Sequence, residues 1–66
     1  MTNEERTILH FCWENPQFTT IQPSLKVNLW GDILRDGKII AESDLHGLPL
    51  ESLGTKLPKT WRVVNG

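Results

Sequence analysis

The stretch SLKVNLWGDILRDGKII, residues 24–40, decides between two folds for this chain. Asp36-Gly37 stands between two apolar pairs, Ile33-Leu34 and Ile39-Ile40, and an Asp-Gly pair tolerates the positive φ angles of a two-residue type I′ turn. In that register Leu34 faces Ile39 and Ile33 faces Ile40, so the ribbon carries apolar pairs on both faces. The alternative is that the stretch forms one coil of a repeat stack. We favour the hairpin, because it needs only local residues to form.

A helix is expected at the N-terminal end of the sequence. Thr2 and Glu5 have the spacing of a capping box, in which each side chain accepts a hydrogen bond from the backbone N–H of the other residue. Asn15-Pro16 should end this helix, because proline disfavours the helical conformation in the residue before it. Apolar residues between these limits recur at three- and four-residue spacing and predict one buried stripe, made of Ile8, Leu9, Phe11, Cys12 and Trp13.

Three strands are expected after the helix, at about 25–35, 38–43 and 60–65. In the first of them, one face would carry Val27, Leu29, Gly31 and Ile33, and the other Lys26, Asn28, Trp30, Asp32 and Leu34. The last strand, Trp61 to Val64, would lie at an edge of the sheet. We therefore expect a single α+β domain over residues 1–66, with the helix packed on a small antiparallel sheet.

The second part of the sequence also contains an internal echo. IQPSLKV, residues 21–27, and LPKTWRV, residues 57–63, share one form: apolar, three residues, large apolar, basic, valine. This phrase resembles the short leucine-rich repeats of many bacteriophage and bacterial proteins, whose units run roughly LP-x-x-L-x-V-x-G-x-L-x-L-x-G-x-x-I. The matching positions within about residues 18–66 are Ile21, Leu25, Val27, Gly31, Ile33, Gly37, Ile39, Leu57-Pro58, Trp61, Val63 and Asn65-Gly66.

The resemblance implies an alternative fold, a helix-capped leucine-rich-like solenoid, and a phage or mobile-element gene. It also implies, in general terms, a surface that binds proteins. Two copies of the phrase are fewer than the three units that such stacks generally need to bury a continuous core.

Composition restricts the class of protein. The chain has 66 residues, of which 38% are hydrophobic, and its three tryptophans indicate a real core rather than disorder. With one cysteine it cannot form an internal disulfide, which is typical of a reduced, cytosolic protein. No apolar run approaches the roughly 18 residues of a membrane span, and the acidic first residues do not resemble a signal peptide. We expect a cytosolic protein that makes no membrane contact.

No catalytic or metal site is expected. His10, Cys12 and Glu14 are spaced two residues apart, so a helix points them to different sides, and zinc sites favour four ligands with paired spacing that this chain lacks. Cys12, His46 and Asp44 can be written as a nucleophile, base and orienting acid, but nothing in the sequence places them together. We expect no enzymatic activity and no cofactor.

A surplus of aromatic residues is the main functional signal. Three tryptophans are hard to bury in so small a domain, and an exposed one is typical of a protein-binding hot spot. Trp13 belongs to the helix stripe and Trp61 to the repeat pattern, which leaves Trp30, with Lys26 and Asp32 on the same strand face, as the predicted contact residue. The sequence therefore predicts a non-enzymatic protein-binding module that occupies a surface of a partner, such as a host protein that it inhibits.

Two alternatives remain. Lys56, Lys59, Trp61 and Arg62 form a basic-aromatic cluster that could grip phosphates and stack a base, although a net charge of −1 gives little attraction to nucleic acid. The second alternative is a homodimer that forms through the uncovered edge of the last strand.

Overall fold

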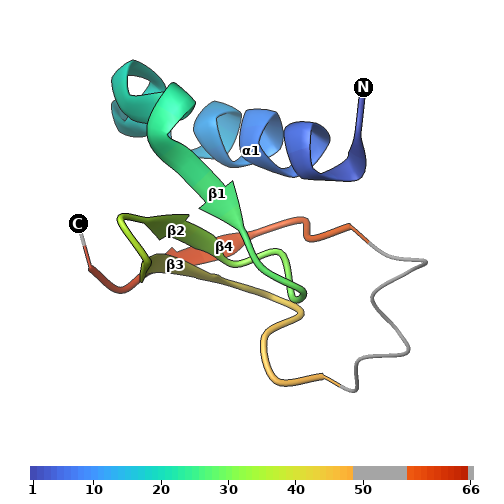
Figure 1. Cartoon of the computed structure of the whole chain (residues 1–66). Helices are drawn as coiled ribbons and strands as arrows, with labels where there is room; N and C mark the ends of the chain where they lie inside the picture. Colours follow the sequence, from blue (N-terminus) through green and yellow to red (C-terminus); the bar gives the residue numbers. More distant parts are fainter. Residues whose placement is uncertain (49–56, 66) are drawn as a thin grey trace.

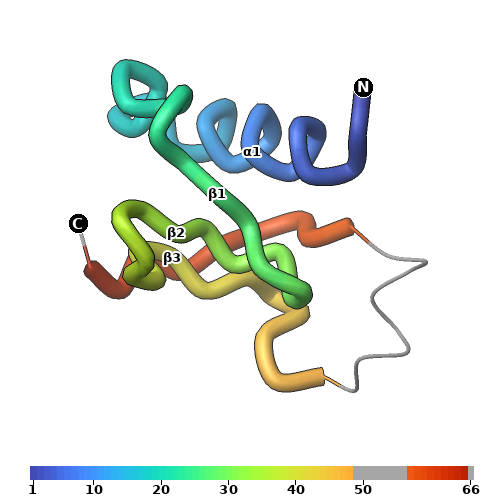
Figure 2. Tube along the Cα trace, in the orientation of Figure 1, coloured from blue at the N-terminus to red at the C-terminus, as the bar shows by residue number. Residues whose placement is uncertain are grey.

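A computed structural model of the chain describes residues 1–48 and 57–65. The helical elements lie on one side of a small sheet, as the ribbon and the tube both show (Figures 1 and 2). In chain order, the elements are α1 (Asn3–Glu14), the 3-10 helix η1 (Pro16–Ser24), β1 (Leu25–Val27), β2 (Ile33–Arg35), β3 (Lys38–Ser43) and β4 (Trp61–Val63). The predicted α+β fold is confirmed. Within the described part of the chain, no helix is both long enough and apolar enough to cross a membrane.

Helix α1 begins and ends at the residues that the sequence indicates. Thr2 is the N-cap: its hydroxyl accepts from the Glu5 N–H and the Glu5 carboxylate accepts from the Thr2 N–H, both at 3.1 Å. The helix ends at Asn15, whose N–H donates to the Phe11 carbonyl at 2.8 Å. The capping box and the Asn15-Pro16 stop are therefore confirmed.

The buried face of α1 differs from the predicted stripe. Thr7, Phe11 and Cys12 are buried, whereas Trp13 is 81% exposed. Each residue of a helix turns by about 100°, so Trp13 lies about 200° beyond Phe11 and points away from the sheet. The assignment of Trp13 to the core is wrong.

Residues 25–35 form two strands instead of the single strand expected. The sheet order is β1-β2-β3-β4 with all pairs antiparallel, so the chain reverses between β1 and β2. The Asn28 side chain closes this turn, because its Oδ1 accepts from the N–H of Trp30 at 2.9 Å and of Asp32 at 3.0 Å. Gly31, with a φ of +77°, supplies the left-handed residue that the reversal needs.

The Asp36-Gly37 hairpin joins β2 to β3 as predicted. Both residues have positive φ, 53° and 78°, and Leu34 faces Ile39. The expected pairing of Ile33 with Ile40 is wrong, because Ile33 faces Ala41 and a β-bulge lies between the two registers. The extra residue lets two consecutive side chains, Ile40 and Ala41, both reach the core.

Strand β4 closes the sheet at its edge. Val63 faces Ala41, Arg62 faces Glu42 and Trp61 faces Ser43. The Val64 N–H donates to the Ile40 carbonyl. In an antiparallel pair, alternate residues direct their N–H and C=O groups toward the neighbouring strand. The N–H and C=O groups of Trp61 and Val63 therefore point away from β3. The third expected strand and its edge position are confirmed. The solenoid alternative is contradicted, because the two repeat-like segments, residues 21–27 and 57–63, supply β1 and β4 at opposite edges of one antiparallel sheet and do not stack as coils.

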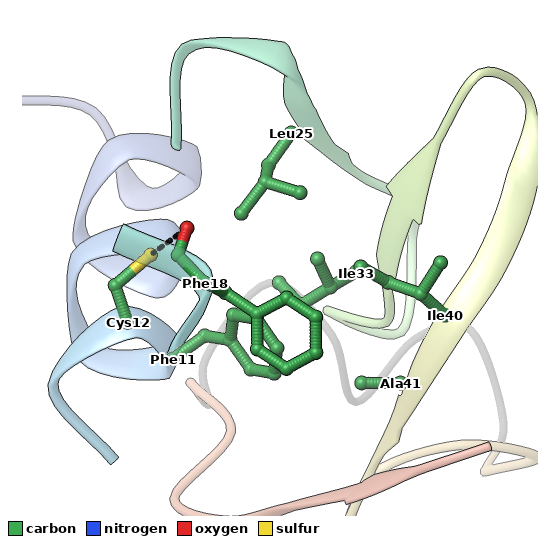
Figure 3. Close-up of a cluster of buried hydrophobic side chains, with 7 residues drawn as sticks. All are labelled: Phe11, Cys12, Phe18, Leu25, Ile33, Ile40 and Ala41. Carbon is green, nitrogen blue, oxygen red and sulfur yellow. Dashed lines mark hydrogen bonds between the residues drawn. The ribbon is translucent and has the colours of Figure 1, made fainter. Parts of the chain in front are cut away.

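The core lies between α1, η1 and the inner face of the sheet (Figure 3). Phe11 is at its centre, with no exposed surface, and its ring lies 5.1 Å from that of Phe18 and 5.5 Å, edge-on, from that of Trp61. The buried members are Phe11, Cys12, Phe18, Leu25, Ile33, Ile40 and Ala41.

Candidate functional site

A buried carboxylate organises the end of the sheet opposite the Asp-Gly hairpin. Asp32 has no exposed surface, although it is charged at neutral pH. Its Oδ1 accepts from the Ser43 N–H at 2.7 Å, and its Oδ2 accepts from the Asn28 amide at 3.0 Å. A buried charge is tolerated only when it is paired and hydrogen-bonded, and these contacts meet part of that need.

His46 supplies the remaining contact. Its Nδ1 lies 2.6 Å from Asp32 Oδ2, and its Nε2 lies 3.6 Å from Glu42 Oε2. Glu42 in turn pairs with Arg62 at 2.7 Å. Four groups of alternating charge therefore run from the turn after β1 to the edge strand.

This arrangement shifts two pKa values in opposite directions. Burial raises the pKa of Asp32, but hydrogen bonds from Ser43, Asn28 and His46, together with the charge of His46, outweigh it and leave the pKa below its ordinary value. The hydrogen bond to Asp32 raises the pKa of His46, and the negative charges of Asp32 and Glu42 raise it further. Desolvation of the ring and the positive charge of Arg62 lower the pKa, but by less. The pair is therefore stabilised in its charged form.

Trp30 is fixed by the same cluster. Its indole N–H donates to the Leu48 carbonyl at 2.8 Å, its ring centroid lies 5.6 Å from that of His46, and its carbonyl accepts from the Ser43 hydroxyl. Trp30 is half-buried in the turn after β1, while Lys26 lies exposed on β1 itself. The expectation that Trp30, Lys26 and Asp32 share one strand face is therefore wrong, because Trp30 and Asp32 lie in the turn between β1 and β2 and Asp32 is buried.

The side chains of the cluster make their contacts within the chain itself. Both ring nitrogens of His46 face carboxylates, and Asp32, rather than Asp44, orients the ring. Cys12 lies in the core, where its thiol is directed at the Phe18 carbonyl at 3.9 Å (Figure 3) and burial raises its pKa. Within residues 1–48 and 57–65, no group of three or more His, Cys, Asp or Glu side chains could hold a metal ion.

The basic-aromatic cluster is only partly assembled. Trp61 is half-buried, its ring lies against Phe11 and edge-on to His10, and its indole N–H donates to the Gly31 carbonyl at 2.9 Å. Arg62 is exposed but paired with Glu42, and Lys59 is exposed. Lys56 lies outside the described residues. The ring that would stack a base thus already packs on the core.

The exposed aromatic residue is Trp13. It stands on the outer face of α1, one turn after Leu9, which is itself 42% exposed. The ring of His10 lies 6.3 Å from the Trp13 ring and 5.2 Å from that of Trp61. Sequence reasoning missed this residue because it treated all apolar positions of the helix as one stripe. A helical projection centred on Phe11 would have turned Trp13 outward.

Comparison with protein-family models, curated proteins and solved structures found no significant match.

Proposed function

We propose that this chain is a small non-enzymatic protein-binding module that acts by occupying a surface of another protein, with Trp13 at the centre of the contact. The observation that carries the proposal is the indole of Trp13, 81% exposed on a helix whose opposite face is packed into the core. Tryptophan is enriched among the few residues that supply most of the binding energy in protein interfaces.

The setting of Trp13 supports this role. The helix is capped at its start and held by Phe11 and Cys12, so the indole is presented from a rigid element. Leu9 adds an exposed apolar side chain one turn away, on the same face. A partner would therefore gain apolar burial without first having to order the segment that carries the anchor.

A site-specific photo-crosslinker tests the proposal. A benzophenone amino acid is placed at position 13 in one sample and at position 38, on the β2–β3 hairpin, in another, and each is irradiated in lysate of the source cells. We expect one adduct from position 13 and none from position 38, and we expect unlabelled wild-type chain to compete while Trp13→Ser does not. Equal adducts from both positions, or equal competition by Trp13→Ser, would contradict the proposal.

A homodimer is the second candidate, and one observation favours it. The N–H and C=O groups of Trp61 and Val63 point outward from the edge of the sheet, where a second β4 could pair with them. An adduct with the mass of two chains, together with a dimer in sedimentation equilibrium, would support self-association over a foreign partner.

Three further parts of the proposal concern the origin of the gene, inhibition of the partner and nucleic-acid binding. A phage or mobile-element origin and an inhibitory action rest on the repeat-like phrase alone. Nucleic-acid binding would have to use Lys59 and Arg62 without a free ring on Trp61. Binding of single-stranded DNA that weakens steeply with salt would revive that alternative.

A further inference from the structure

A short turn after β3 projects from the sheet on the side away from α1 (Figure 1). This 45–48 turn is closed by two backbone hydrogen bonds, from the His46 N–H to the Ser43 carbonyl at 3.2 Å and from the Leu48 N–H to the Leu45 carbonyl at 3.1 Å. Leu45 is half-buried, and residues 46–48 are exposed. Segments with so little apolar burial and with exposed backbone hydrogen bonds open at a low cost in free energy. The side-chain contacts of His46 therefore matter for whether the turn stays on the sheet.

The ring of His46 spans two carboxylates that belong to other elements. Nδ1 lies 2.6 Å from Asp32 Oδ2, in the turn between β1 and β2, and Nε2 lies 3.6 Å from Glu42 Oε2 on β3. An imidazolium carries a proton on both nitrogens, whereas a neutral imidazole carries one. Because the buried Asp32 needs a donor, the neutral ring keeps its proton on Nδ1 and turns the lone pair of Nε2 toward the negative Glu42. Only the protonated ring therefore binds both carboxylates.

The surroundings of the ring allow this proton to come and go. The His46 side chain is 38% exposed, so water reaches it. Arg62 on β4 pairs with Glu42 at 2.7 Å, so Glu42 keeps a partner when His46 is neutral. The hydrogen bond to Asp32 is the largest reason that the pKa of His46 is raised, and the proton is therefore lost above the ordinary value of about 6.5.

The remaining charged groups of this region are Asp44 and Lys59. The Asp44 carboxylate accepts from the Lys59 N–H at 3.3 Å, and both side chains are exposed. This bond joins the chain before the 45–48 turn to the chain before β4, and it does not depend on the proton of His46. The turn can therefore open while its first end stays in place.

Trp30 is the side chain that the 45–48 turn covers. Its indole N–H donates to the Leu48 carbonyl at 2.8 Å, and its ring centroid lies 5.6 Å from that of His46. Both contacts come from the turn, so an opened turn would leave the indole without this acceptor and without this neighbouring ring. The indole N–H of Trp30 thus reports directly on the state of the turn.

We propose that His46 is a proton-operated latch: the protonated ring holds the 45–48 turn on the sheet by bridging Asp32 and Glu42, and the neutral ring lets the turn open and uncovers Trp30. The core around Phe11 stays folded, because apolar packing does not depend on this proton. Histidine is the side chain whose charge changes near physiological pH, so the latch opens as pH rises through that range and closes as it falls. It goes beyond the proposed contact at Trp13 and does not depend on it.

Solvent exchange of the indole N–H groups tests the latch in the whole ¹⁵N-labelled chain. The exchange rate of Trp30 is divided by that of the exposed Trp13, which removes the intrinsic effect of pH, and the ring nitrogens of His46 are titrated in the same samples. Below the midpoint of the His46 titration, Trp30 should exchange about tenfold more slowly than Trp13. Above it, the ratio should rise toward one with the same midpoint.

Three variants separate the latch from other causes. His46→Gln should leave the turn open, with a ratio near one at every pH. Glu42→Gln should keep the turn closed at every pH, because a side-chain amide can accept from Nε2 of the protonated ring and donate to Nε2 of the neutral ring. His10→Gln, which removes the other histidine of the chain, should leave the wild-type profile unchanged.

Several outcomes would overturn the latch. One is a ratio that stays constant while His46 titrates, and another is a rise that persists in His46→Gln or disappears in His10→Gln. The backbone amides of Phe11 and Ile33 should stay protected throughout. If they lose protection with the same midpoint, the whole domain unfolds and no separate latch exists. Crosslinking from position 13 is decided independently of all these results.

Discussion

The two ends of the sheet are held by different kinds of contact. Near the Asp-Gly hairpin, α1 and η1 cover the sheet with apolar side chains around Phe11. At the other end, the buried residues Asp32 and Ser43 form a polar cluster with the exposed His46. Apolar packing is non-directional and depends on area, whereas a buried carboxylate is stable only if each partner is in place. The apolar region should therefore supply most of the free energy of unfolding of the domain. The polar region should determine how the chain reverses between β1 and β2.

The largest expected effect comes from the apolar region. Phe11→Ala should lower the free energy of unfolding by about 3–5 kcal/mol, because Phe11 has no exposed surface. A domain of this size has roughly that much stability, so the variant should be largely unfolded in urea titrations followed by circular dichroism. Trp13→Ala removes a larger side chain from the same helix but should change stability by no more than about 0.5 kcal/mol. Similar losses in both variants would contradict the division of α1 into a core face and a free face.

The polar region is tested next. Asp32→Asn keeps the shape of the side chain but removes the charge that Ser43 and His46 share, and should cost about 1–3 kcal/mol. Asp36→Asn is the matched control, since Asp36 is exposed and asparagine tolerates its positive φ. Guanidinium unfolding of both variants measures the difference. Equal stability would mean that the polar cluster adds nothing to the fold.

The two chain reversals, between β1 and β2 and between β2 and β3, can be compared through their glycines, Gly31 and Gly37. Gly37 and Gly31 have nearly equal φ, 78° and 77°, so alanine at either position should cost about 1–2 kcal/mol in backbone strain. A Cβ at Gly37 would meet nothing within 4 Å, whereas one at Gly31 would lie 2.2 Å from Cγ of Pro58. We expect Gly31→Ala to be the more destabilising in thermal unfolding. The reverse order would contradict the close approach of Pro58.

The smallest expected effect is that of pH. The pKa of His46 is raised on folding, so its contribution is complete below its unfolded value of about 6.5 and is lost as pH rises through the folded value. The pKa of Asp32 is lowered, so its contribution is present above about 3.9 and is lost as pH falls through the folded value. Stability should be greatest between these limits. His46→Gln should reduce the loss of stability as pH rises above this range. If the loss is unchanged in the variant, another titratable group is responsible for it.

The parts of the fold that the sequence predicts are those with local signals. Thr2 and Glu5 cap the helix, Asn15-Pro16 ends it, and Asp36-Gly37 closes the hairpin, in each case through contacts within a few residues. The split of residues 25–35 depends on Ser43 and His46, which meet Asp32 from 11 and 14 residues away. Asn28 with Gly31 was a local signal for that turn, but it stands within a run of apolar residues that resembles a strand.

The sequence predicts an exposed tryptophan at position 30, whereas the structure has one at position 13. Surplus tryptophan indicated an exposed anchor, yet Trp30 is tied to Leu48 and Trp13 is free. Exposure depends on which helix residue faces the sheet, and the apolar pattern alone left Phe11 and Trp13 equivalent. The β-bulge at Ile40 likewise has no local signal, because either Ile40 or Ala41 could have faced Ile33.

The contact between Phe11 and Trp61 also affects how the chain folds during its synthesis on the ribosome. The two residues lie 50 positions apart in the sequence, and at about 5–20 residues per second the second is made roughly 2.5–10 s after the first. In that interval α1 can pack on η1 and β1 but has no β4, so the part of its apolar face that Trp61 covers is open to chaperones and to other nascent chains. The fold is therefore completed in one late step, when the edge strand meets the first helix.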